Sequence, residues 1–126
     1  MNNAELYMEF NEKCTDGLIV DRNEFSKRLK KMKKGTIIEQ IDGKYQIYYP
    51  LEAGEKQEHT QNGLLELRID PAARIRFEGS LKDYEDLLKE IKKIGVGICN
   101  FKVYCKLREG DADSDFFIAD VYYLMQ

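Results

Sequence analysis

The sequence predicts one α+β domain, in which a largely antiparallel sheet carries two helices packed on one face. Two segments space their apolar residues three or four apart, as amphipathic helices do. Several shorter segments alternate apolar and polar residues, as half-buried strands do, and turn residues separate them. With 126 residues, 43% of them apolar, the chain can bury a core, so we expect residues 1–126 to fold as a single unit.

Residues 4–11 begin the chain with a pattern that fits two structures. Their apolar residues alternate as in a strand, but together with Cys14 they also fit one face of a helix. We predict a strand here.

A lysine-rich helix is predicted over residues 24–34. Asp21 is a natural N-cap, Glu24 is placed to complete a capping box, and Gly35 ends the segment. The narrow apolar stripe of this helix consists of Phe25, Leu29 and Met32. We expect the stripe to face the sheet.

The middle of the chain predicts further strands. Residues 36–50 form a hairpin about Asp42-Gly43, a dipeptide that favours a type I′ turn. Residues 52–63 are polar and without period, so we predict a loop, and two short strands follow on either side of Pro71. The element order is then β-α-β-β, one additional strand, and β-α-β-β again, which suggests two similar halves.

The second predicted helix, over residues 81–94, has the clearest pattern in the chain. Ser80 is its N-cap, acidic residues follow in the first turn and lysines in the last, and Gly95 is placed for a left-handed C-terminal position. One face collects the apolar residues Leu81, Tyr84, Leu87, Leu88, Ile91 and Ile94.

Two strands are predicted to end the chain, over residues 97–109 and 115–125. Alternation in the first places Cys99 and Cys105 toward the core. The second is apolar on both faces, which is typical of a central strand or of one that presents a face to a partner. Two helices, one of them with only a narrow apolar stripe, are too few to cover both faces, so we expect a symmetric homodimer through Phe116, Ile118, Tyr122 and Leu124.

Between these strands, Asp111, Asp113 and Asp115 recur at every second position behind a glycine. An EF-hand calcium loop starting at Asp111 would need glycine at its sixth position and glutamate at its twelfth, where Phe116 and Tyr122 stand. We therefore predict an acidic hairpin turn and no metal site.

Composition and cysteine use predict a cytoplasmic protein without cofactors. The formal net charge of −3 gives no general attraction to nucleic acid or to anionic lipid, and no secretory signal or membrane-spanning segment is evident. Three cysteines, an odd number, occur without any Cys-x-x-Cys spacing for zinc.

The usual equipment of an enzyme is missing from the sequence. A nucleophilic Cys14 or serine would need a base, and the only histidine, His59, lies in the polar loop without an indicated partner. There is also no glycine-rich phosphate-binding motif. We expect a non-catalytic protein.

Two binding hypotheses remain. The first is a protein-binding inhibitor or immunity-type protein of bacterial or phage origin, which masks a basic target surface with acidic patches and tyrosines. Its candidate anchors are Tyr45, Tyr48, Tyr49 and Tyr122, although tyrosines in such strands more often pack in the core.

The second hypothesis is a nucleic-acid or acidic-ligand module that uses the lysine-rich helix. Its candidate basic patch consists of Lys27, Lys30, Lys31 and Lys34. The alternative is a solvated outer face that balances acidic neighbours such as Glu39 or Glu52. Nucleic-acid modules usually carry aromatic side chains beside their basic residues, and none is evident beside these lysines. We therefore expect a protein partner rather than nucleic acid.

Overall fold

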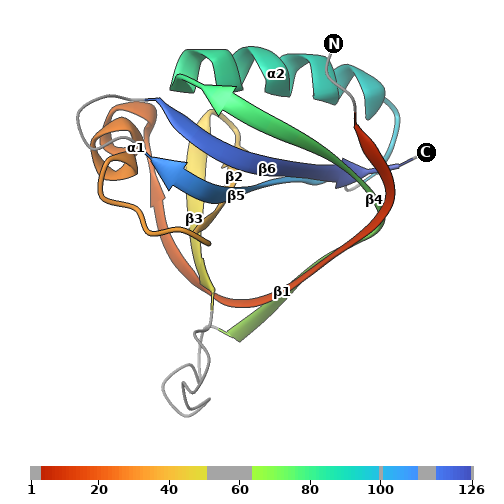
Figure 1. Cartoon of the computed structure of the whole chain (residues 1–126), viewed down its shortest axis with the longest axis horizontal. Coiled ribbons are helices and arrows are strands. Elements are labelled where there is room, and N and C mark those ends of the chain that lie inside the picture. The colour runs from red at the N-terminus through yellow and green to blue at the C-terminus, as the bar shows by residue number, and fades with distance from the viewer. Residues whose placement is uncertain (1–3, 51–63, 100, 111–115, 126) are drawn as a thin grey trace.

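The computed structural model describes residues 4–50, 64–99, 101–110 and 116–125 (Figure 1). In chain order the elements are β1 (Glu5–Val20), α1 (Arg22–Leu29), β2 (Ile37–Ile41), β3 (Lys44–Pro50), β4 (Leu64–Gly79), α2 (Leu81–Ile94), β5 (Val103–Gly110) and β6 (Phe117–Leu124). All strand pairs are antiparallel, and they close a barrel in the order β1-β3-β2-β5-β6-β4. The predicted α+β class is confirmed, and the element order is β-α-β-β twice.

The two short strands predicted around Pro71 are one continuous strand, and this part of the prediction was wrong. β4 runs from Leu64 to Gly79 and changes partner along its length: its first part pairs with β1, and residues 72–79 pair with β6. Pro71 lies where the β1–β4 register shifts, between the Met8–Ala72 and Phe10–Ile69 pairs. A proline is tolerated in a strand at such an irregularity, because its missing N–H is not needed there.

The strand predicted for residues 4–11 is confirmed, and it continues to Val20. β1 pairs with β4 over its first two thirds and with β3 from Cys14 onward. It therefore joins the two ends of the sheet and closes the barrel. In Figure 1, the middle of β1 and the first part of β4 form a long curved wall that lies away from the helices, whereas the second part of β4 runs beneath α2.

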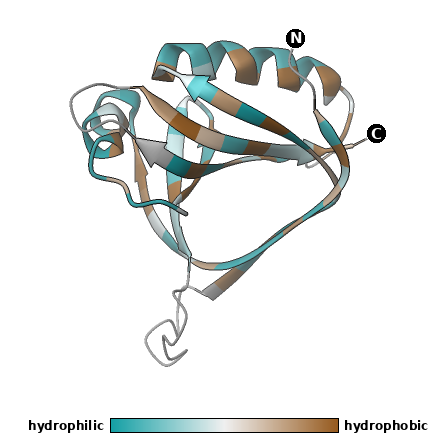
Figure 2. Ribbon diagram, viewed as in Figure 1, coloured by the Kyte–Doolittle hydropathy of each residue, from teal (hydrophilic) through white to brown (hydrophobic). Residues whose placement is uncertain are grey.

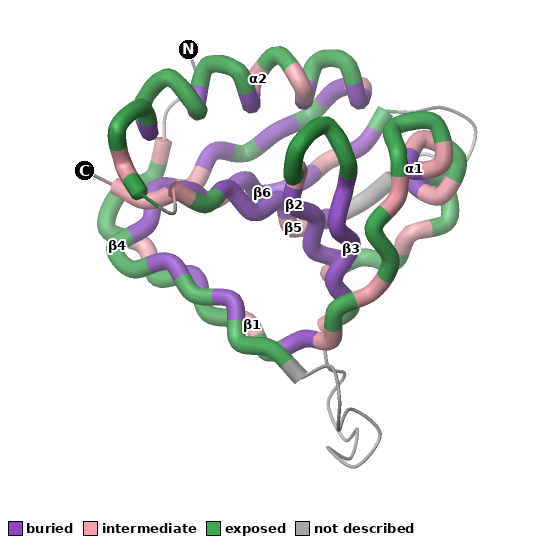
Figure 3. The backbone as a smooth tube through the Cα atoms, turned by 180° about the vertical axis from the view of Figure 1, so that it is seen from behind, coloured by how far each residue is buried: buried purple, intermediate pink, exposed green. Residues whose placement is uncertain are grey.

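Two apolar cores lie on opposite faces of the barrel wall. The first packs both helices against strands β2 to β6, and the underside of α2 in Figures 2 and 3 is apolar and buried. The second fills the barrel, where Phe10 of β1 stacks on Tyr104 of β5 and lies against Tyr122 of β6, although neither strand is a neighbour of β1. The second core comprises Phe10, Cys14, Ile37, Tyr48, Leu67, Ile69, Ala72 and Tyr104.

These two cores explain why β6 is apolar on both faces. β6 lies between β5 and β4, as a central strand. Phe117, Ala119 and Val121 face the helices, whereas Tyr122 and Leu124 pack against the core inside the barrel. We predicted that this second face would be left bare and would form a homodimer. In the structure, the same chain covers most of it.

The lysine-rich helix is shorter than predicted. α1 ends at Leu29, so Lys30, Lys31, Lys33 and Lys34 lie beyond it. Gly35 already donates its N–H to the carbonyl of Leu107, at 2.8 Å, and Leu107 donates to the carbonyl of Thr36, at 2.9 Å. Because residues 35–36 are tied to the end of β5, the preceding residues must cross from the helix to the sheet. The N-cap is as predicted, since Asp21 accepts a hydrogen bond from the Glu24 N–H.

The bounds and N-cap of the second helix are confirmed, but the role of Gly95 was wrong. Ser80 and Asp83 form a reciprocal capping box. Gly95 has an ordinary φ of −86° and not a left-handed one. A Cβ at this position would lie 2.3 Å from the ring of Phe101, so a close approach requires the glycine.

Cys99 does not face the core, contrary to the prediction from alternation. β5 begins only at Val103, and residues 95–99 form turns that leave Cys99 exposed. Cys14 and Cys105 are buried as expected. Burial raises the pKa of the Cys14 thiol to about 11, with help from the carboxylates of Glu12 and Asp16, and burial raises that of Cys105 to about 12.

We therefore expect one fast-reacting thiol per native chain at pH 8, because only the thiolate is nucleophilic. Labelling with a thiol reagent and counting adducts by mass spectrometry checks this. Cys99→Ser should remove the fast phase, while denaturant should expose all three thiols of the wild type. Fast labelling of Cys14 or Cys105 in the native protein would contradict the burial described above.

Candidate functional site

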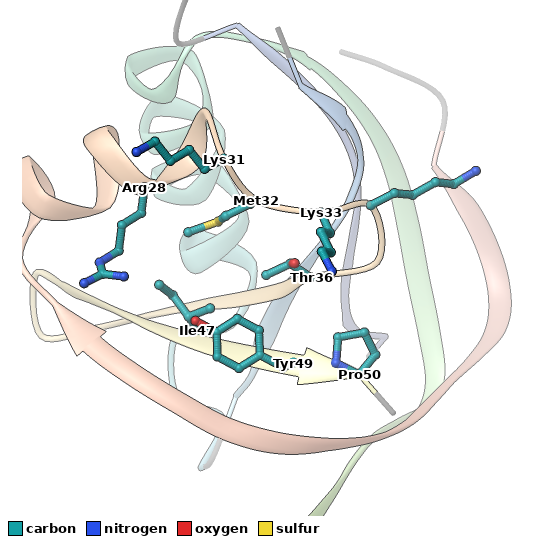
Figure 4. A pocket seen from close by; sticks show the side chains of 9 residues that line it. Arg28, Lys31, Met32, Lys33, Thr36, Ile47, Tyr49 and Pro50 are labelled. Carbon is teal, nitrogen blue, oxygen red and sulfur yellow. The ribbon is translucent and has the colours of Figure 1, made fainter. Parts of the chain in front are cut away.

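A pocket of about 440 Å³ lies between the segment that follows α1 and the strand β3 (Figure 4). Its lining residues are Arg28, Lys31, Met32, Lys33, Lys34, Thr36, Ile47, Tyr49 and Pro50. The pocket thus combines cationic side chains from one segment with an apolar and aromatic floor from another. Its volume lies in the range of small-molecule sites.

The early end of α1 creates this pocket. Because the helix stops at Leu29, residues 30–35 cross above β3 instead of continuing the helical direction. The hydrogen bonds of Gly35 and Thr36 to Leu107 fix the far end of this crossing segment. Met32 packs against the helix-side core, which holds the segment down at its middle.

The charge of the pocket lining is entirely positive. Four of its nine residues are cations and none is an acid. Arg28 lies 2.8 Å from the Glu24 carboxylate, whereas within the described ranges Lys31, Lys33 and Lys34 pair with no carboxylate. An anion in the pocket would therefore be attracted by the positive charges of its lining.

Glu39 does not balance these lysines, although the solvated-face alternative assigns it that role. It is buried beside the barrel core, where it accepts a hydrogen bond from the Tyr48 hydroxyl at 2.7 Å and lies 3.4 Å from the Lys102 ammonium. Glu52, the other proposed neighbour, is outside the described residues.

Tyr49 forms the aromatic part of the floor and is held over a glycine. Its side chain is 44% exposed. The ring lies so close to Gly17 of β1 that a Cβ there would come within 2.4 Å of the ring carbon Cε2. An aromatic ring placed over a cross-strand glycine is a recognised way to fill the space that the missing side chain leaves. The missing side chain of Gly17 therefore leaves the space that the ring of Tyr49 occupies.

The other three candidate tyrosines are buried or half-buried. Tyr45 is fully buried, stacks on Phe25 and donates a 2.6 Å hydrogen bond to Glu85. Tyr48 is buried and bonds Glu39, and burial raises the pKa of both phenols. Tyr122 is half-buried in the barrel core. Tyr49 is the candidate that lines the basic pocket.

The structure divides the predicted basic patch. Lys31 and Lys34 line the pocket, whereas Lys27 and Lys30 are exposed outside its lining. Arg28 and Lys33 also line the pocket, but the predicted patch did not include them. They belong to the same run of six cations, and the sequence does not show which of the six line the pocket unless the end of the helix is known. No sequence pattern marks Pro50 or Gly17 as part of a site, because their positions near the pocket depend on the pairing of β1 with β3.

Some predicted features lie outside the described residues. They are His59 with its loop, and the three aspartates at 111, 113 and 115. The strands that flank the aspartates, β5 and β6, are antiparallel neighbours as predicted. Of the helices that the structure describes, neither is long and apolar enough to cross a bilayer.

By fold, the protein is an α+β protein with a closed antiparallel barrel, and by its site it carries a basic pocket with a tyrosine floor. A family model matches residues 1–125, and the chain belongs to that family, which is described as a family of unknown function (DUF5975). Comparisons with curated proteins and with solved structures gave no match.

Proposed function

We propose that this protein is a non-catalytic cytoplasmic binding module that holds an anionic group of its ligand in the basic pocket. The observation that supports this most is a set of three lysines that have no carboxylate partner among the described residues and that line a pocket with an apolar and aromatic floor. By contrast, Lys102, Lys106 and Arg108 of β5 and the residues before it each lie beside an acid.

This proposal develops the second of the two binding hypotheses. The first, an inhibitor that masks a basic target, relies on tyrosine anchors, and three of the four candidates are buried or half-buried. The pocket also has the opposite charge to the one that a basic target would require. The structure therefore supports the acidic-ligand module better.

Fluorescence anisotropy with labelled anionic probes tests the proposal. A labelled ten-residue thymidylate and a labelled polyglutamate should be titrated at low salt with the wild type and with Lys31→Glu/Lys33→Glu/Lys34→Glu. We expect the wild type to bind at least one probe, and the variant to lose about a hundredfold or more in affinity. For three phosphate contacts, the logarithm of affinity should fall with the logarithm of salt with a slope of about −2.

A matched control is Lys82→Glu/Lys89→Glu/Lys93→Glu, which changes the net charge by the same amount on exposed positions of α2 outside the pocket lining. The control should bind as the wild type does. Failure of both probes to bind, or equal losses in the two variants, would refute the proposal.

A further inference from the structure

We infer that the ligand of the basic pocket is a nucleotide unit, a planar base joined to phosphate, with the base stacked on Tyr49. This inference rests on the anion-binding function proposed above and assigns its ligand class. Proteins that bind single-stranded nucleic acid combine a cationic groove with aromatic side chains on which bases stack. Both parts meet in this pocket.

The first support is the position of the Tyr49 ring. One side of the ring is occupied by the backbone of Gly17 and leaves no room for any side chain at that position. The remaining exposed part of the ring lines the pocket, as Figure 4 shows. The ring therefore offers an exposed aromatic surface inside the pocket, on which a base can stack.

The second support is the shape of the space around the ring. Met32, Ile47 and Pro50 give the pocket apolar sides next to Tyr49, and the volume of about 440 Å³ is sufficient for a base and its sugar. In the view of Figure 4, Arg28 lies on one side of Tyr49 and Lys33 on the other. A planar apolar group on the ring would therefore have cations near its edges.

The third support is the kind of cation. Planar bidentate binding of a carboxylate is the speciality of arginine, and Arg28 already lies against Glu24. The three remaining cations are lysines, which act as point charges and commonly bind phosphate. An acidic peptide would use the charges but would have no use for the aromatic platform, so the lining favours a nucleotide.

The test compares two probes that differ only in their bases. A labelled ten-residue thymidylate and a labelled abasic phosphodiester of the same length carry the same charge. We expect the wild type to bind the thymidylate about five- to a hundredfold more tightly, the range that stacking of one base supplies. Tyr49→Ala should remove this difference and leave abasic binding unchanged, and Tyr49→Phe should retain it.

Gly17→Ala tests whether Gly17 is a positioning residue. The added Cβ would lie 2.4 Å from the Tyr49 ring and 2.8 Å from the backbone oxygen of Ile47, so both the ring and the adjoining strand backbone must shift. We expect weaker thymidylate binding with unchanged abasic binding, provided that thermal unfolding shows the variant to be folded. If Gly17→Ala does not fold, Tyr49→Ala and Tyr49→Phe still decide the question.

The outcomes separate this inference from the function on which it rests. Equal affinity for the two probes, or tighter binding of polyglutamate than of thymidylate, overturns the nucleotide assignment and leaves an anion-binding pocket. If the thymidylate, the abasic phosphodiester and polyglutamate all fail to bind, both the nucleotide assignment and the proposed anion-binding function are overturned. If free ADP binds and Tyr49→Ala weakens that binding, the inference is supported and the ligand is a free nucleotide. If thymidylate binds and ADP does not, the inference is supported and the ligand is a nucleic-acid strand.

Discussion

Phe117→Ala is expected to lower the free energy of unfolding by about 3–5 kcal/mol, the usual cost of removing a buried phenylalanine. Phe117 is 1% exposed and lies where β6 meets α2. Its ring centroid is 5.1 Å from that of Phe77 and 5.9 Å from that of Tyr84. Truncation removes both aromatic contacts and opens a cavity beneath the helix. Urea unfolding, followed by circular dichroism, measures the loss.

The preceding residue supplies the control. Phe116 is 42% exposed, so Phe116→Ala should change stability by no more than about 1 kcal/mol. Alternation alone allows either face of this strand to be the inner one. Equal losses for the two variants would contradict the placement of Phe117 under α2.

Phe10→Ala is expected to cost a similar amount, about 3–5 kcal/mol, because it empties the centre of the barrel. Phe10 is 3% exposed and lies 5.4 Å from the Tyr104 ring and 4.6 Å from the Tyr122 ring, between centroids. The variant should unfold at lower urea concentration with an unchanged slope, because the surface exposed on unfolding is nearly the same.

Leu6→Ala is the matched control for Phe10. Strict alternation would place both side chains on one face, but the β1–β4 register shifts between Glu5 and Met8 and leaves Leu6 54% exposed. We expect a change within about 1 kcal/mol. A loss at Leu6 as large as that at Phe10 would show that β1 does not close the barrel as described.

Features encoded by local patterns could be predicted from the sequence. The capping box and apolar face define α2 without reference to the rest of the chain. Asp42 and Gly43 have φ values of 50° and 78°, as the type I′ turn requires, and set the register of the hairpin. The buried cysteine on β5 also follows from alternation within one strand.

Features that depend on distant segments could not be predicted. The pairing of β1 with β4 closes the barrel, yet no local pattern indicates it. Leu107, more than 70 residues away, accepts a hydrogen bond from the Gly35 N–H and donates one to the Thr36 carbonyl, and these bonds lead the chain away from the direction of α1. The candidate site depends on both, because β1 brings Gly17 under Tyr49 and the short helix brings the lysines above it. A charge run could therefore be recognised, but the pocket could not.

Lysine footprinting tests the role of the pocket most directly. The native protein should be acetylated briefly with and without the ten-residue thymidylate, and modification at each lysine measured by mass spectrometry. We expect the thymidylate to slow acetylation of Lys31, Lys33 and Lys34 at least threefold and to leave Lys82 and Lys93 on α2 unchanged. Uniform rates with and without the probe, or protection of the α2 lysines instead, would contradict a binding site in the basic pocket.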